Sequence, residues 1–152
     1  MLKLRTGLGV LLALLVTGCT STPEASPDRD AEAKQFLTHP GTAAIYVYRP
    51  DVDRFEDHVD LYIDERLVGE TLPRTYFRVD VAPGRHVLQG SGLDLGKIEL
   101  DARPGTLVFV EQDVAAGQSH FRMVPEETGR KRLLACCTRL ERWAPGQRPF
   151  LK

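Results

Sequence analysis

Apolar and polar residues alternate over most of the chain between residues 43 and 124, a period of two that is typical of half-buried β-strands. Pro83-Gly84 and Pro104-Gly105 are turn signals between such segments. The unbroken apolar run at residues 107–110 favours a central strand. Strands at this spacing predict a mostly β protein, a small β-sandwich of about seven or eight strands.

Two stretches have a different pattern. Residues 29–37 contain regularly placed alanines and end before Pro40, which predicts a short helix. Pro125, followed by two glutamates, is typical of the first turn of a helix. We therefore expect one short helix near the C-terminus, reaching about residue 135, although Gly129 inside it lowers the helix propensity.

The N-terminus has the three parts of an export signal. Lys3 and Arg5 precede a charge-free, Leu-rich run at residues 8–16, which is shorter than the about 20 residues that cross a bilayer. The segment Leu-Val-Thr-Gly-Cys at residues 15–19 resembles a bacterial lipobox, in which the cysteine directly follows Gly or Ala. This resemblance implies cleavage before Cys19 and lipidation of Cys19 by diacylglycerol and an N-acyl chain of the palmitate type. An ordinary secretory signal is the alternative.

Such a lipid anchor would place the protein in the bacterial envelope. Three acyl chains hold a protein durably, whereas one chain binds a membrane only marginally. Thr20 follows the cysteine, and in similar lipoproteins an Asp there signals retention in the inner membrane. We therefore expect an outer-membrane lipoprotein whose domain faces the periplasm or the surface.

The chain divides into four parts. We expect a lipoprotein signal peptide at residues 1–18 and a β-sandwich domain at residues 42–141. Residues 19–41 are expected to hold the lipidated cysteine and a flexible spacer with a possible short helix, because they begin rich in Ser, Thr and Pro. Residues 142–152 contain two prolines and predict a loosely ordered tail.

Charge argues against a nucleic-acid partner. The signal holds two of the 20 basic residues, Lys3 and Arg5, and none of the 21 acidic ones. The rest of the chain therefore has 18 basic and 21 acidic residues, a net charge of −3. A protein that binds nucleic acid shows a basic patch or stripe instead.

Cys136-Cys137 is the most unusual pair in the expected domain. Adjacent Cα atoms lie about 3.8 Å apart, below the roughly 4.4–6.8 Å of ordinary disulfides. The two residues have three alternative roles: packing at a helix end, a vicinal or intermolecular disulfide with a redox role, or binding of a soft metal. Two thiolates are too few for a closed zinc site, so we expect no metal.

The four tyrosines are the second candidate feature. Tyr46, Tyr48, Tyr62 and Tyr76 would form an aromatic binding platform if they shared an open sheet face, and core if a helix covered that face. No catalytic constellation is found, and we expect no enzyme and no cofactor apart from the covalent lipid on Cys19.

A series of short motifs resembles the bacterial envelope family called domain of unknown function 2846. It consists of Ile-Tyr-Val-Tyr-Arg-Pro at 45–50, Leu-Tyr-Ile-Asp at 61–64, Val-Gly at 68–69, Tyr-Phe at 76–77 and Val-Ala-Pro-Gly-Arg-His at 81–86. Residues 59–88 are also similar to a PEGA-type repeat. Glu65 departs from the pattern because Gly is usual at that turn. The resemblance implies a transthyretin-like or PEGA-like β-sandwich on a lipoprotein, and no established reaction.

The sequence therefore favours a non-catalytic, membrane-anchored lipoprotein that binds or scaffolds another envelope component. We expect a membrane contact through the lipid and an envelope protein or peptidoglycan as partner. Two alternatives stay open. One is an assembly subunit of a secretion system, which rests on fold analogy alone. The other is a redox-responsive protein that uses Cys136 and Cys137.

Overall fold

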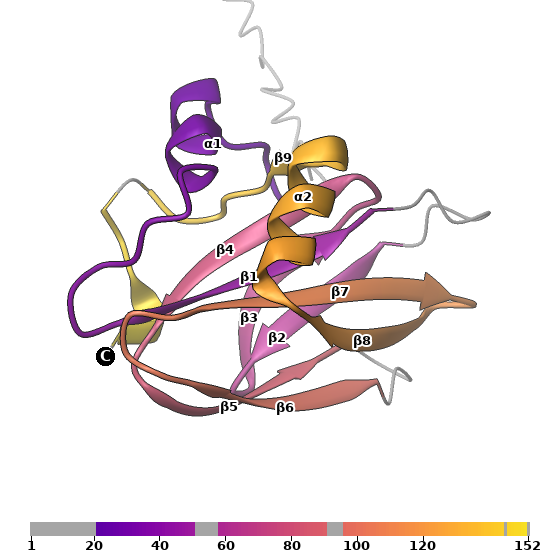
Figure 1. The fold of residues 1–152 in the computed structure, drawn as a ribbon. Helices are drawn as coiled ribbons and strands as arrows, with labels where there is room; N and C mark the ends of the chain where they lie inside the picture. The colour runs from indigo at the N-terminus through magenta and orange to yellow at the C-terminus, as the bar shows by residue number, and fades with distance from the viewer. Residues whose placement is uncertain (1–20, 51–57, 91–95, 145, 152) are drawn as a thin grey trace, which may run out of the picture.

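The computed structural model describes residues 21–50, 58–90, 96–144 and 146–151, which form two β-sheets with two helices on one side (Figure 1). The strand orders are β8-β7-β1-β4-β9 in a five-stranded sheet and β3-β2-β5-β6 in a four-stranded sheet. This confirms the mostly β architecture with a helix near the C-terminus, with nine strands in the described residues. The elements are α1 (Pro27–Ala33), β1 (Ala43–Arg49), β2 (Val59–Ile63), β3 (Arg66–Thr71), β4 (Thr75–Val81), β5 (Gly84–Gln89), β6 (Lys97–Ala102), β7 (Leu107–Ala115), β8 (Gln118–Val124), α2 (Glu126–Cys136), β9 (Thr138–Arg139) and the 3₁₀ turn η1 (Pro149–Leu151).

Strand β1 lies in the middle of the five-stranded sheet and is buried on both faces. Ile45 and Val47 belong to the core between the sheets, whereas Tyr46 and Tyr48 belong to a second core beneath the helices. Strand β7 pairs parallel to β1 and has only β8 beyond it. The apolar run at 107–110 is thus an interior strand, but the central one is β1.

Helix α2 occupies the predicted place and rests on β7. Gly129 makes this contact possible, because a Cβ at that position would lie 2.3 Å from Cγ of Phe109. The glycine that argues against a helix by propensity is therefore the point where the helix backbone meets the sheet. Helix α1 begins at Pro27, two residues earlier than predicted, because Ser26 accepts the backbone N–H of Arg29 as an N-cap.

The predicted flexible spacer is wrong from Thr22 onward. Thr22 is buried, and its Oγ1 accepts a hydrogen bond from the backbone N–H of Glu70 at 2.7 Å. Glu24 forms a β-bridge with Leu140, and α1 follows directly. The segment satisfies edge groups of both sheets, so it is part of the domain.

The predicted loose tail also packs on the domain. Phe150 is only 7% exposed, belongs to the core between the sheets, and meets Trp143 edge to face at 5.5 Å between ring centroids. Arg66 lies over the Phe150 ring and donates a hydrogen bond to the carbonyl of Pro149. The contacts of the buried Phe150 ring with Trp143 and Arg66 therefore hold this end on the domain, despite the prolines that suggested a loose tail.

The turn between β2 and β3 has two residues, and both have positive φ: 49° at Asp64 and 63° at Glu65. This is the type I′ geometry that matches strand twist and favours Gly at its second position. Asp64 is held there, since its carboxylate accepts hydrogen bonds from His86 Nδ1 at 2.6 Å and from the backbone N–H of Val87 at 2.9 Å. The turn type is thus settled despite the missing glycine.

Glu65→Gly is expected to raise the free energy of unfolding by about 0.5–1 kcal/mol, because glycine removes the left-handed strain of a residue with a Cβ. The gain is partly offset by the greater freedom of glycine in the unfolded chain. Urea denaturation measures the change. Glu65→Ala keeps the Cβ and is the control, and an equal gain in both variants would contradict the explanation.

Candidate functional site

The four tyrosines do not form an open platform, so the aromatic binding face is corrected. Tyr46, Tyr48 and Tyr76 are at most 1% exposed and lie beneath the helices, whereas Tyr62 is on β2 in the other sheet and half-buried. The Tyr46 hydroxyl donates to the carbonyl of Ala33 at 2.7 Å, and burial raises the pKa of Tyr46 to about 12. The Tyr76 hydroxyl donates to Asp30 at 2.8 Å. These side chains attach α1 to the sheet.

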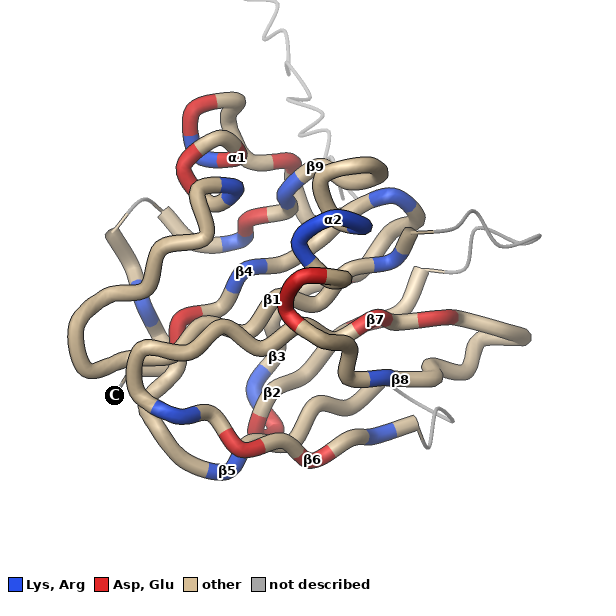
Figure 2. The backbone as a smooth tube through the Cα atoms, viewed as in Figure 1, with Lys and Arg blue, Asp and Glu red and all other residues tan. Residues whose placement is uncertain are grey.

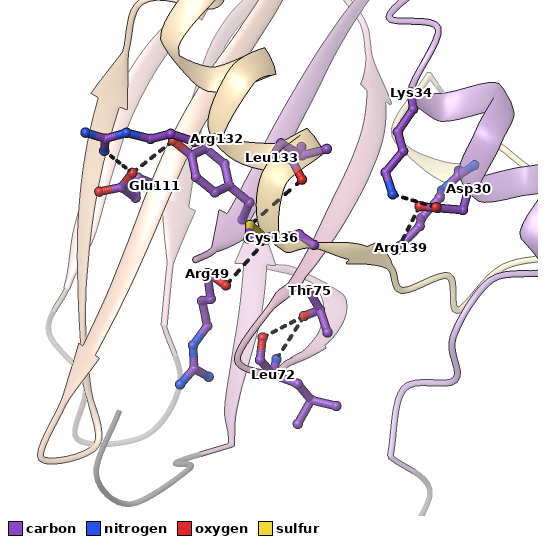
Figure 3. The surroundings of a disulfide bond; sticks show 12 residues. Asp30, Lys34, Arg49, Leu72, Thr75, Glu111, Arg132, Leu133, Cys136 and Arg139 are labelled. Carbon is purple, nitrogen blue, oxygen red and sulfur yellow. Dashed lines mark hydrogen bonds and ion pairs between the residues drawn. A yellow bond between two sulfur atoms is a disulfide. The ribbon is translucent and has the colours of Figure 1, made fainter. Parts of the chain in front are cut away.

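Glu111 on β7 connects Tyr48 to α2. It accepts hydrogen bonds from the Tyr48 hydroxyl at 2.9 Å and from Arg122 and Arg132, the last shown in Figure 3. Burial by itself raises the pKa of Glu111, but the hydrogen bonds from Arg132, Tyr48 and Arg122 outweigh it and lower the pKa below its usual value. Glu111 is therefore a structural carboxylate that stays ionised.

Glu111→Gln is expected to lower the free energy of unfolding by about 1.5–3 kcal/mol at pH 7, the range for lost hydrogen bonds to a charged group. A lowered pKa in the folded state means that the ionised form stabilises the fold above the ordinary pKa of 4.5 and loses this effect as the pH falls through the folded pKa. Urea denaturation at a series of pH values from 7 downward should show the difference between the two proteins narrowing once the pH falls below 4.5. Glu127→Gln, on the exposed side of α2, is the control. A difference that is independent of pH would contradict this role.

A disulfide joins Cys136 and Cys137 where α2 ends (Figure 3). Among the alternatives from the sequence, the structure contains the vicinal disulfide. Cys137 is 4% exposed, and its sulfur lies 3.7 Å from the carbonyl oxygen of Arg49. Cys136 is half-buried, and its sulfur lies 3.8 Å from the carbonyl oxygen of Leu133. Solvent therefore reaches the Cys136 side of the bond more readily.

A pocket of about 100 Å³ lies between α1, β4, β9 and the C-terminal segment. We call it the arginine pocket, because four guanidinium groups line it together with three carboxylates. Blue and red segments, which mark basic and acidic residues, lie close together on α1 and around β9 (Figure 2). The charged residues of the wall are Arg29, Arg78, Arg139, Arg148, Glu32, Asp80 and Glu141.

Two carboxylates organise these arginines. Glu141 binds Arg29 through both oxygens, at 2.7 and 3.2 Å, and also accepts from Arg139 at 2.8 Å. Asp80 accepts from Arg78 at 3.1 Å. Such forked pairs are rigid, and they fix three of the four arginines around the pocket.

Arg139 is the most buried arginine of the pocket, at 7% exposure. Burial lowers its pKa; Glu141 opposes this effect, and Arg29 adds to the lowering. Its Nη1 donates to the carbonyl of Arg29 at 2.9 Å, while its Nε has no hydrogen-bond partner among the described residues. A buried N–H without a partner is costly, so this atom is suited to an acceptor from outside.

Sequence reasoning missed this pocket. It assigned Arg29 and Glu32 to the spacer and Trp143 and Arg148 to the tail, and placed only Arg78, Asp80, Arg139 and Glu141 of the charged wall in the β-sandwich domain. The signal that could have revealed it is the density of arginine next to the single tryptophan near the C-terminus. The candidate lipidation site, Cys19, lies outside the described residues.

Two further features bear on chemistry. No group of three or more His, Cys, Asp or Glu side chains that could hold a metal ion is found within the described ranges. Among the helices of those same ranges, none has the length and apolar character required to cross a membrane.

Comparison with known proteins places the chain in a family. A family model described as protein of unknown function (DUF2846) matches residues 39–125. A Haemophilus influenzae protein, described as an uncharacterized protein, is 29% identical over 126 residues, which cover 79% of this chain and 75% of the relative. No solved structure matches significantly. The motifs from β1 to β5 that suggested this family lie within the matched residues, and the chain belongs to the DUF2846 family.

Proposed function

We propose that this protein is a non-catalytic lipoprotein of the bacterial envelope, held in the outer membrane by lipid on Cys19, which binds or scaffolds another envelope component. The observation that carries the proposal is the lipobox-like segment at residues 15–19 after a short Leu-rich run. A folded domain that begins only three residues after Cys19, at Thr22, is consistent with an anchored protein. The proposed partner is an envelope protein or peptidoglycan.

The anchor is tested by expressing the full chain and Cys19→Ala in a bacterium with an outer membrane. We expect the full chain in the outer-membrane fraction, with an intact mass that reflects loss of residues 1–18 and gain of lipid. Cys19→Ala should lack the lipid mass and leave that fraction. An unlipidated wild-type protein in the soluble periplasm would overturn the proposal.

The partner is tested by cross-linking in living cells, with Cys19→Ala as the unanchored control, followed by mass spectrometry. Specific envelope proteins or wall fragments captured only by the anchored form would support a binding or scaffolding role. A reaction catalysed by the purified protein and abolished by one point substitution would contradict the non-catalytic part of the proposal.

A second candidate is a redox-responsive protein, which the disulfide between Cys136 and Cys137 favours. Reduction would transfer two electrons and two protons from an external dithiol and leave two thiols at the end of α2. Alkylation of protein from native envelopes, with and without reductant, measures the state of the pair. If thiols and disulfide never interconvert under envelope redox conditions, the bond is structural only.

A further inference from the structure

The arginine pocket carries an excess of one positive charge. Four guanidinium groups and three carboxylates line it, so the wall is not neutralised from within. A bound monoanion balances this charge, whereas a dianion such as a phosphate monoester leaves an excess negative charge. The charge count therefore favours a carboxylate over a phosphate.

Arg148 and His39 are loosely placed in the wall. Arg148 Nε and His39 Nε2 each lie 3.7 Å from Oδ2 of Asp80, and Arg148 Nη2 lies 3.5 Å from His39 Nδ1. These separations are longer than good hydrogen bonds. The ion pair of Arg148 with Asp80 is therefore weak, and it leaves the Arg148 guanidinium without a strong partner. Arg148, with a 40% exposed side chain, is able to turn toward a ligand without losing a close partner.

The size and the apolar wall restrict the ligand further. About 100 Å³ is well below the roughly 300–1,000 Å³ of drug-sized sites, so the pocket takes a small group rather than a whole cofactor. Trp143 and Phe150 form one wall, beside the guanidinium groups. A guanidinium group can bind both oxygens of a carboxylate, and the adjacent apolar wall can contact a small apolar side chain attached to that carboxylate.

We infer that the arginine pocket binds the terminal carboxylate of a short peptide. Arg148 and the unpartnered Nε of Arg139 provide donors, and Trp143 contacts the last residue of the peptide. Six of the charged and aromatic residues involved, Arg29, Glu32, Arg139, Glu141, Trp143 and Arg148, lie outside the residues that the family model matches. The inference concerns this chain's own termini and does not depend on lipidation of Cys19.

Trp143 provides a direct readout, because it is the only tryptophan of the chain. Protein purified from cells that express the full chain is titrated with N-acetyl-Ala-Ala and with its C-terminal amide, and tryptophan fluorescence and calorimetry are recorded. We expect the acid to bind about tenfold or more tightly than the amide, a difference of about 1.4 kcal/mol or more, since hydrogen bonds to a charged group are stronger than those to a neutral one. Equal binding of acid and amide, or no binding of the acid at 10 mM, overturns the inference.

A matched pair of variants separates the pocket from general charge. Arg148→Gln removes the loosely placed donor and should weaken binding of the acid about tenfold or more while the melting temperature is retained. Arg142→Gln changes an exposed arginine of the same segment that does not line the pocket, and should bind as the unmodified protein does. Equal effects of the two substitutions would indicate general electrostatic attraction and overturn the inference.

A competition titration identifies the chemical class of the bound anion. Inorganic phosphate, acetate and muropeptides with free stem-peptide carboxylates compete with N-acetyl-Ala-Ala in the fluorescence titration. We expect muropeptides to compete at least as well as the dipeptide, and acetate weakly, because acetate lacks the group that contacts Trp143. Stronger competition by phosphate than by the dipeptide would contradict a carboxylate site.

Discussion

Gly129→Ala is expected to lower the free energy of unfolding by about 2–3 kcal/mol, although alanine raises the helix propensity by about 1 kcal/mol. The added methyl would lie 2.3–2.5 Å from Cβ, Cγ and Cδ1 of Phe109, and Phe109 is itself only 1% exposed. Helix α2 therefore has to move away from β7, or Phe109 has to leave its rotamer. Urea denaturation followed by circular dichroism measures the loss.

Two further variants identify the cause. Lys131→Ala, on the exposed side of the same helix, should change stability by no more than about 0.5 kcal/mol. Phe109→Leu combined with Gly129→Ala should be less destabilised than the sum of the single changes, because the smaller side chain makes room for the methyl. If Gly129→Ala proved as stable as the unmodified protein, α2 would not rest on β7 as described.

Removal of residues 21–37 is expected to lower the free energy of unfolding by more than about 5 kcal/mol, or to prevent folding, compared with a chain that begins at Ser21. The deletion uncovers the core beneath the helices, where the Phe36 ring is tilted against the rings of Tyr46 and Phe109, with centroids 5.4 and 5.8 Å apart. It also removes the acceptors of the Tyr46 and Tyr76 hydroxyls, and each of these hydrogen bonds contributes about 0.5–1.5 kcal/mol. Thermal unfolding compares the two chains.

Two single substitutions at neighbouring positions of the same segment test the prediction with a stability change that can be measured in a folded protein. Phe36→Ala should lower the free energy of unfolding by about 3–4 kcal/mol, because Phe36 is 7% exposed. Leu37→Ala should change it by less than about 0.5 kcal/mol, because Leu37 is 63% exposed. A flexible spacer would give small and equal effects at both positions, and that result would refute the ordered segment.

The strands and the second helix were predictable because their signals are local. The alternation along β2 and β4 follows from one sheet face packing on the core, and the Pro83-Gly84 turn agrees with it. The burial of Tyr46 and Tyr48 was not predictable, because alternation looks the same whether the outer face meets water or a helix. Only the tertiary contacts with Phe36 and with α2 decide between these states.

The arginine pocket was not predictable for a related reason. Its residues come from α1, β4, β9 and the C-terminal segment, which are distant in sequence. Composition assigned both ends of the chain to flexible regions, because Ser, Thr and Pro are common in linkers. Thr22 and Phe150 are nevertheless buried, because they contact residues that are distant in the sequence. A short window of sequence does not contain such contacts.

The hydrogen bond of Thr22 also limits how far the domain can travel. Three virtual bonds of about 3.8 Å separate the Cα atoms of Cys19 and Thr22, so with lipid on Cys19 the fold is held within about 11 Å of its anchor. A disordered stalk of about 40 residues would instead reach roughly 35 Å on average. With lipid on Cys19, a tether this short would confine the domain to diffusion in the plane of the membrane, and a soluble partner would have to come to the membrane surface to bind it.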